Sequence, residues 1–455
     1  MEAAKPADTM TTVATPETAR VVAARRLGAA RLGREALAAA GLAGIVVATF
    51  IFVAATAAGP FRFVRNGAFV DDGLPGWITG PLTGLSSPLD DEGLIVLSCV
   101  LLALYVLIVA LADVIRPSWA IATILVVHVL FVLGPPQWLT DAFNYLGFAR
   151  LGVLHGLDPY GHTPAAATMD PSFQYVTWPH LTSPYGPLFT LASYGLVPLG
   201  VAGGLWALKV GTMAASLGCL VLVWRIAQRL ERPPVPAVLF VGLNPLALIY
   251  GVGGAHNDVF MMLLALAGVW WALAGRAALG AGAVVAAAAI KASAGLALPF
   301  MWIASAQRGR LARGAAVAAI AVLALTIVAF GSDVLGALTS FSDQGGHTSL
   351  RSFPGQLSQA FAGAHDVSPG IHVAVQVALG LVVVGLIVSV RRGMSWIVAT
   401  GWAMLALLLA LAWAMPWYVA WVLPFAAVGG DRRLRVAALT CTAFLLVVRM
   451  PYPPF

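Results

Sequence analysis

The chain has 455 residues, of which 60% are hydrophobic and only 10% are charged. A soluble domain usually carries about 25% charged residues, so this composition excludes an ordinary globular enzyme and indicates a protein that crosses a membrane several times. The net charge of +7 would suggest a nucleic-acid partner for a soluble chain, but in a membrane protein it indicates basic loops at the cytoplasmic face. We therefore expect a lipid bilayer and no nucleic acid among the partners.

The beginning of the chain is polar and basic, and an apolar run follows from about residue 37 to residue 59. That run is too long and lies too far from the start for a cleaved signal peptide. We therefore expect a cytoplasmic basic segment over residues 1–36, followed by a single transmembrane domain over residues 37–455.

Thirteen apolar runs in all predict an all-α polytopic membrane protein with about 13 transmembrane helices. With the N-terminus inside and the sides alternating, most of the 26 lysine and arginine residues fall on cytoplasmic segments, which fixes the predicted orientation. The runs lie at about residues 37–59, 94–112, 118–136, 205–228, 235–252, 258–274, 277–290, 292–306, 314–331, 371–390, 395–415, 417–430 and 436–449.

The stretch from residue 184 to residue 201 is apolar enough to span, but counting it would place the later basic loops outside. Its prolines and glycines also favour an interfacial or re-entrant element, so we expect outer juxtamembrane helices there. The large loops then lie on the outer side, at about residues 60–93, 137–204 and 332–370. We predict that the chemistry takes place there.

Asp141 stands where an outer helix is expected to begin, at the membrane surface. A partly desolvated carboxylate at that depth can act as a general base on a sugar hydroxyl. Thr140 and Asp141 are also good N-cap residues, so their position alone leaves a purely structural role equally open.

Aromatic residues gather in the same loop and in a late outer turn. Trp178 and Tyr185 lie in a proline-rich stretch, and Trp417 and Tyr418 follow Pro416. Carbohydrate sites commonly use aromatic faces held by stiff loops. Tyrosine and tryptophan are also common at any membrane interface, so an aromatic belt is the alternative.

Three consecutive polar residues, His256, Asn257 and Asp258, are flanked by long apolar runs. Polar groups are costly at membrane depth, so they are candidates for function. His256 could bind a phosphate or orient a carboxylate, Asn257 could hold a sugar hydroxyl, and Asp258 could cap the next helix. Too few metal-binding residues occur at a readable spacing to predict a metal site, and no motif supports a divalent cation or another cofactor.

Lys291 is one of three lysines and stands alone between the short apolar runs 277–290 and 292–306. Runs of this length are short for a bilayer core of about 30 Å and indicate a hairpin of broken helices. A lone lysine there suits a lipid phosphate, although snorkelling to the headgroups would also explain it. His347 and Arg351 in the last large outer loop could add phosphate contacts.

Several short motifs together resemble membrane glycosyltransferases of the GT-C fold, and more closely the actinobacterial polyprenol-phosphate-mannose-dependent α-1,6-mannosyltransferases that build lipomannan-type cores. The motifs are Asp141-Ala142-Phe143-Asn144-Tyr145, Gly156-Leu157-Asp158-Pro159-Tyr160, Ser183-Pro184-Tyr185-Gly186-Pro187, Asn244-Pro245, Gly253-Gly254-Ala255-His256-Asn257-Asp258 and Pro416-Trp417-Tyr418.

The resemblance implies an inverting transfer of mannose from polyprenyl-phosphate mannose to a lipid-linked or envelope glycan, a glycolipid or a polysaccharide. It implies a bacterial plasma-membrane protein with a cytoplasmic N-terminus, an extracytoplasmic active site and α-1,6-linked products. The first-loop acid is the base in such families, so Asp141 takes that role. Lys291, Arg351, His256 and His347 would then bind the donor phosphate. The predicted sugar and acceptor contacts are Asn257, Asp258, Tyr145, Trp178, Tyr185, Trp417 and Tyr418.

Three other interpretations stay open on the residues alone, and one of them is a structural or assembly partner in an envelope complex. An arabinosyl or glucosyl transferase with a polyprenyl-phosphate donor would share these motifs, because pocket contacts decide which sugar is used. A lipid-linked sugar flippase or transporter would also have many spans and broken helices, but it would show internal symmetry, which is not evident in the sequence.

Overall fold

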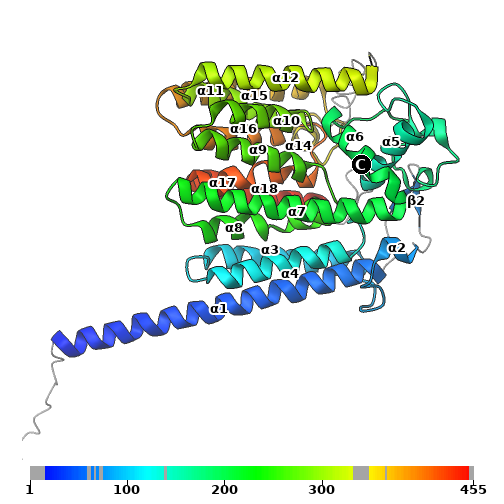
Figure 1. The fold of residues 1–455 in the computed structure, drawn as a ribbon. Coiled ribbons are helices and arrows are strands. Elements are labelled where there is room, and N and C mark those ends of the chain that lie inside the picture. The colour runs from blue at the N-terminus through cyan, green and yellow to red at the C-terminus, as the bar shows by residue number, and fades with distance from the viewer. Residues whose placement is uncertain are drawn as a thin grey trace, which may run out of the picture.

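The chain is helical over most of its length in a computed structural model that describes residues 16–58, 63–65, 68–70, 75–137, 141–331, 348–363 and 366–449. Most of the helices lie side by side, one layer above another (Figure 1). In the described part of the chain, five helical stretches are long and apolar enough to cross a membrane, as expected for a polytopic membrane protein. They are Ala30–Ala58, Asp91–Ala110, Pro187–Arg229, Arg308–Phe330 and Pro369–Arg391.

The first layer consists of α1 (Pro16–Ala58), α3 (Asp91–Ala110) and α4 (Pro117–Leu133), with α1 packed against the other two. The carboxylate of Asp90 caps α3 by accepting a hydrogen bond from the backbone N–H of Gly93 at 2.8 Å. The N-terminal part of α1 extends beyond the other helices (Figure 1).

A short segment after α1 departs from the helical pattern. Strands β1 (Phe63–Arg65) and β2 (Ala68–Val70) form an antiparallel pair in which Phe63 lies opposite Val70. The four-residue helix α2 (Gly76–Thr79) follows. The hairpin could not be predicted from the apolar runs, because strands of three residues are too short to form such a run.

The central helices are α7 (Gly200–Arg229), α8 (Pro234–Gly242), the π-helix η4 (Ala247–Val252), α9 (Asp258–Leu273) and α10 (Ala277–Ala288). Polar contacts join them to the first layer. Tyr105 of α3 donates a hydrogen bond to the Phe240 carbonyl at 2.6 Å, and a ring nitrogen of His128 lies 2.9 Å from the Ser216 hydroxyl. Such contacts satisfy polar side chains that would otherwise be buried without a partner.

The remaining helices complete the bundle. Most side chains of α12 and α15 are exposed, as expected where apolar helices face lipid. The elements are η5 (Ala292–Leu296), α11 (Ala297–Ala304), α12 (Arg308–Phe330), α14 (Phe353–Ala362), α15 (Pro369–Arg391), α16 (Trp396–Ala410), η7 (Pro416–Trp421), α17 (Leu423–Gly429) and α18 (Arg432–Arg449).

These helices coincide with the predicted apolar runs. Of the three short runs in which broken helices were expected, 277–290 forms the single helix α10 and the other two are divided. The run at 292–306 divides into η5 and α11, and the run at 417–430 divides into η7 and α17. The number of membrane crossings stays a prediction.

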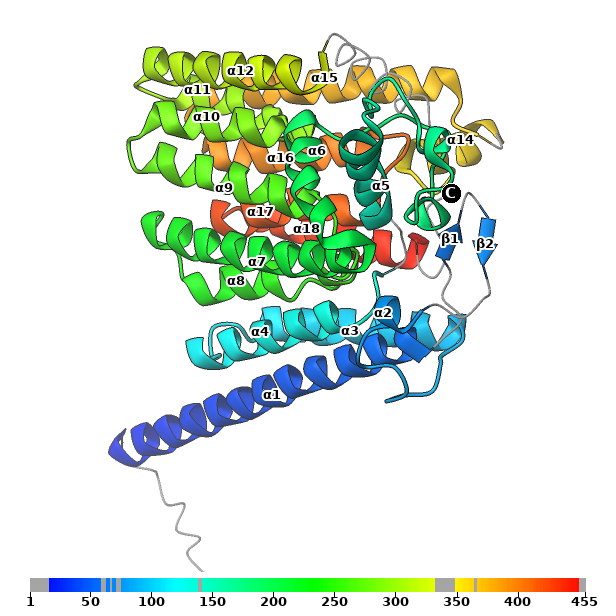
Figure 2. The ribbon, with the colours of Figure 1, turned by 45° about the vertical axis from the view of Figure 1, so that its right-hand side comes forward.

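The described parts of the three predicted outer loops gather at one end of the bundle (Figures 1 and 2). There, α2 and α14 lie near a group of elements that connects α4 to α7. That group is α5 (Asp141–His155), η1 (Pro164–Ala167), η2 (Phe173–Tyr175), α6 (Pro187–Ser193) and η3 (Tyr194–Leu199). In the predicted interfacial stretch, α6 and η3 are short helical pieces that meet α7 at Gly200, where φ is +68°.

Candidate active site

A cavity of about 410 Å³ lies at this end of the bundle. Its walls come from α5, the segment before α6, the turn between α10 and η5, and the beginnings of α15 and η7. Seven residues predicted from the sequence line it: Asp141, Trp178, Tyr185, Asn257, Lys291, Trp417 and Tyr418. The fold therefore brings the predicted acid and the predicted lysine to one cavity although they lie far apart in the chain.

Asp141 is the first residue of α5, and its side chain is 17% exposed. The side-chain amide of Asn144, one turn further along, donates a hydrogen bond to Asp141 Oδ1 at 3.4 Å. The Asn144 carbonyl oxygen accepts a hydrogen bond from the backbone N–H of Thr177 at 2.9 Å. Asn144 thus ties the acid to the segment that carries Trp178.

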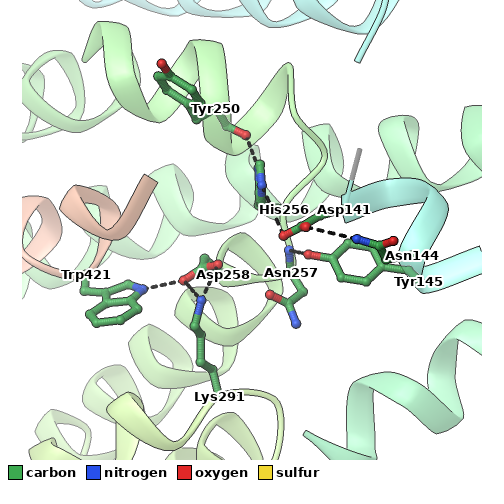
Figure 3. Close-up of polar contacts among 9 residues, drawn as sticks. All are labelled: Asp141, Asn144, Tyr145, Tyr250, His256, Asn257, Asp258, Lys291 and Trp421. Atoms are coloured by element: carbon green, nitrogen blue, oxygen red, sulfur yellow. Dashed lines mark hydrogen bonds and ion pairs between the residues drawn. The ribbon is translucent and has the colours of Figure 1, made fainter. Parts of the chain in front are cut away.

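His256 lies behind Asp141 (Figure 3). Its side chain is fully buried, and its Nε2 lies 3.5 Å from Asp141 Oδ2. The other ring nitrogen, Nδ1, lies 2.6 Å from the carbonyl oxygen of Tyr250. The imidazole also stacks on the Trp417 ring, with centroids 3.8 Å apart. This placement favours the alternative that His256 orients a carboxylate over the alternative that it binds a phosphate.

An unusual stretch of backbone holds His256 in place. The π-helix η4 leads into Gly253 and Gly254, and Ala255 has a φ of +54°, which is rare for a residue other than glycine. A Cβ on Gly254 would lie 2.6 Å from His256 Nδ1. Backbone strain of this kind persists where the surrounding structure enforces it, often at functional sites.

Asp258 and Lys291 form an ion pair (Figure 3). The Lys291 ammonium group lies 2.8 Å from each carboxylate oxygen of Asp258. The indole N–H of Trp421 donates to Asp258 Oδ1 at 2.6 Å. Asp258 is 1% exposed, whereas Lys291 is 24% exposed and its ammonium group lies 4.1 Å from the centroid of the Tyr418 ring. Asp258 therefore anchors Lys291 rather than facing the cavity itself.

The proline-rich segment before α6 docks on the backbone that precedes Lys291. The N–H groups of Gly186 and Leu188 donate to the carbonyls of Ile290 and Ala289, each at 3.2 Å. A Cβ on Gly186 would lie 2.2 Å from the Ala289 oxygen, so only glycine allows this approach. The segment thereby fixes both Tyr185 and the turn that carries Lys291.

Two tyrosines fill the space between Asp141 and Asn257. The Tyr145 hydroxyl accepts a hydrogen bond from the backbone N–H of Asn257 at 3.1 Å, and its ring meets that of Tyr185 edge to face with centroids 4.5 Å apart. Burial, followed by the nearby Asp141 carboxylate, raises the pKa of Tyr185 well above its usual value. Both tyrosines therefore stay neutral hydrogen-bonding groups.

A buried carboxylate braces α5 against the segment that follows it. Asp170 is 2.8 Å from Arg150 Nε and 3.0 Å from His155 Nε2. Burial raises the pKa of Asp170, but the hydrogen bonds from Arg150 and Ser172 outweigh that effect and hold its pKa well below the usual range. The brace orients the segment that leads to Trp178.

Several cavity residues were missed by the sequence analysis. His372 and Gln376 of α15 line the cavity. They are one helical turn apart at the start of an apolar span, a spacing that places them on one face. That polar pair is the signal that could have identified them.

Two predicted phosphate ligands stand apart from this group. His347 lies outside the described residues. Arg351 is not among the described residues that line the cavity, but the nearby Ser349 N–H donates to the carbonyl of Ala412, which does line it. Arg351 is therefore only two residues away from a backbone contact with the cavity wall. Among the residues that the structure describes, no three His, Cys, Asp or Glu side chains are grouped so that they could hold a metal ion.

The fold and the cavity define a polytopic membrane protein whose acid, lysine and aromatic side chains meet at one end of its apolar helices. Two family models match the chain: "Alpha-(1->6)-mannopyranosyltransferase, N-terminal domain" over residues 40–307 and "MptB C-terminal domain" over residues 361–453. The chain belongs to the alpha-(1->6)-mannopyranosyltransferase family, because the first match covers more than half of its length. The resemblance noted from its motifs is thereby confirmed.

Curated relatives share part of this sequence. Alpha-(1->6)-mannopyranosyltransferase A of Mycobacterium tuberculosis is 35% identical over 178 residues, which are 37% of this chain and 33% of that protein. Alpha-(1->6)-mannopyranosyltransferase A of Corynebacterium glutamicum is 30% identical over 186 residues, which are 39% of this chain and 37% of that protein. The match thus spans only about a third of either relative. No solved structure matches the chain.

Proposed function

We propose that this chain is an inverting membrane mannosyltransferase of the GT-C type. It would move mannose from polyprenyl-phosphate mannose to a lipid-linked or envelope glycan and form α-1,6 linkages. Membership of the family supports the sugar and the linkage. The observation that carries the reaction type is that Asp141 lines the same cavity as Lys291 and the aromatic side chains.

Asp141 acts as the general base in this proposal. The acceptor hydroxyl gives its proton to the Asp141 carboxylate while its oxygen forms a bond to C1 of mannose. The bond between C1 and the phosphate oxygen breaks, and the electron pair leaves with the polyprenyl phosphate. A phosphate leaving group requires positive charge more than it requires a proton, so the acid and the cation do separate work.

Lys291 binds the departing phosphate in this proposal, with His372 and Arg351 as further contacts. The ammonium group stays positively charged in its pair with Asp258, which fixes it at the cavity wall, where it can donate a hydrogen bond to the phosphate. His372 lines the cavity from α15. Because most of α15 is exposed, its position also suits a lipid chain that enters from the bilayer.

Sugar and acceptor contacts fall to the aromatic residues Trp178, Tyr185, Trp417 and Tyr418, and to Asn257. All five line the cavity. Flat aromatic faces pack against the C–H groups of sugars, and an amide can hydrogen-bond a hydroxyl on each of its two sides. Tyr145 supports this wall from behind, because it is buried and contacts Asn257.

We place the cavity on the extracytoplasmic side of about 13 spans. The helix ends opposite the cavity carry Arg229, Arg308, Arg391 and Arg432, and basic residues favour the cytoplasmic side. In a Cys99→Ser background, a membrane-impermeant maleimide applied to intact cells should label His162→Cys, on the cavity side, and not Arg310→Cys. Labelling of only Arg310→Cys would reverse the orientation.

The test of the proposed function is an assay with purified protein. Short-chain prenyl-phosphate mannose, arabinose and glucose are offered separately with an α-1,6-linked mannose disaccharide, and the products are identified by NMR. We expect mannose alone to move, to O6. Transfer of arabinose or glucose instead would support the other transferase reading. Movement of the donor across vesicles without any transfer would support a flippase.

A further inference from the structure

One atom of the site has no described hydrogen-bond partner. His256 Nε2 is fully buried and makes no hydrogen bond within the described part of the chain, although it lies 3.5 Å from Asp141 Oδ2. A buried nitrogen without a partner is costly, so such a group in a native site calls for a reason. Packing of the ring is not that reason, because the Tyr250 carbonyl and the Trp417 ring already hold the imidazole in place.

The other ring nitrogen shows which tautomer is present. A carbonyl oxygen can only accept a hydrogen bond, so the 2.6 Å contact with the Tyr250 carbonyl places a hydrogen on Nδ1. In the neutral ring, Nε2 then carries a lone pair that points toward Asp141. An ionised carboxylate also offers only lone pairs, so the two atoms cannot bond until a proton arrives between them.

We propose that Asp141 and His256 form a proton relay, with Asp141 taking the proton of the acceptor hydroxyl and His256 Nε2 receiving it from Asp141. This inference rests on the proposed function and deepens it. As the acceptor oxygen bonds to C1 of mannose, its proton moves to Asp141 Oδ2. The protonated Oδ2 then donates a hydrogen bond to His256 Nε2. Transfer of the proton to Nε2 yields an imidazolium beside a carboxylate.

The relay gains its effect from a difference between two states. Nε2 is unpaired before the reaction and gains a hydrogen bond as Asp141 becomes protonated, so the contact stabilises the transition state more than the resting enzyme. Trp417 is stacked against the imidazole at 3.8 Å and stabilises the positive ring that results. His256 therefore acts through Asp141 and never touches the sugar, which makes it a positioning and relay residue.

The ionisable groups around the pair either stay neutral or have partners of their own. Among the described residues, Tyr145 and Tyr185 lie beside Asp141 and burial keeps them neutral, and Tyr418 lies against the Lys291 ammonium group. The next charged groups are Asp258 and Lys291, which pair with each other. Asp141 and His256 are therefore the two groups of this part of the site that can exchange the proton of the acceptor hydroxyl.

The test is the solvent deuterium isotope effect on mannose transfer in His256→Gln, measured with short-chain prenyl-phosphate mannose and the mannose disaccharide. Glutamine keeps a polar atom near Nε2 but cannot take up a proton. We expect kcat at neutral pH to fall about 10- to 100-fold while the donor KM stays nearly unchanged. The isotope effect on kcat should also shrink, because the second proton transfer, from Asp141 to His256, is lost.

A matched control is His128→Gln, because His128 is equally buried and its Nδ1 also contacts a backbone carbonyl, that of Ile124. Its kcat and isotope effect should equal those of the wild type. If His256→Gln does not fold, the dependence of the wild-type rate on the deuterium content of the solvent replaces it, because the relay moves two protons and a lone base moves one.

An unchanged isotope effect in folded His256→Gln, or a dependence on a single proton in the wild type, would overturn the relay, even if the rate fell. The proposed function is judged separately: it fails if the wild type transfers no mannose or if Asp141→Asn is fully active.

Discussion

Two carboxylates belong to the site, and each is the first residue of a helix: Asp141 of α5, which lines the cavity, and Asp258 of α9, which lies behind Lys291. Asp258 is buried, and its oxygens are satisfied at 2.6–2.8 Å by Lys291 and Trp421. Asp141 is partly exposed, and its contacts with Asn144 and His256 are long, at 3.4 and 3.5 Å. The same residue at the same helical position is thus a fixed counter-ion in one place and a candidate base in the other.

The largest effect should follow from neutralising Asp141, the partly exposed carboxylate. In Asp141→Asn, the amide keeps the size of the side chain but cannot take a proton, so transfer should fall about 10²- to 10⁴-fold. Binding of the prenyl-phosphate donor and thermal stability should persist, because Asp141 makes only long contacts. Steady-state kinetics and donor titration check this, and full activity would exclude a base role for Asp141.

Neutralising Asp258, the buried carboxylate, should instead destabilise the protein. Asp258→Asn leaves the Lys291 ammonium group unpaired in a mostly buried site, and breaking a buried ion pair costs about 3–5 kcal/mol. Thermal unfolding in detergent measures the loss. The double variant Asp258→Asn/Lys291→Met should regain most of the stability without regaining transfer. A single variant as stable as the wild type would show that the pair does not anchor the site.

A smaller effect is expected at the lipid-facing wall. Hydrogen bonds to charged groups contribute about 1.5–3 kcal/mol, so His372→Ala should raise the donor KM about tenfold and change kcat little. Val373→Ala is the matched control, because Val373 is the next residue of α15 and is exposed; it should behave as the wild type. An unchanged donor KM in His372→Ala would remove His372 from the phosphate contacts.

Much of the fold was predictable because apolar runs of helical length directly reflect the bilayer core. The candidate site was predictable where polar residues interrupt such runs, as His256 and Lys291 do. These residues are conspicuous because burying them among apolar residues requires partners.

Pairings across the fold could not be predicted. Lys291 bonds Asp258, 33 positions earlier in the chain, and no local pattern links the two. The placement of His256 behind Asp141 depends on the π-helix and the positive φ of Ala255, which leave little trace in the sequence beyond two glycines. The strands of the β1–β2 hairpin are likewise too short to give a recognisable pattern in the sequence.

The central claim is that Asp141 acts as a base in one direct displacement and not as a nucleophile. The most direct test is the anomeric configuration of the product, determined by NMR from a donor of known β configuration in a single-turnover reaction. The account predicts an α-mannoside, formed with inversion at C1. A β-mannoside would mean retention and two successive displacements, and it would contradict the assignment of Asp141.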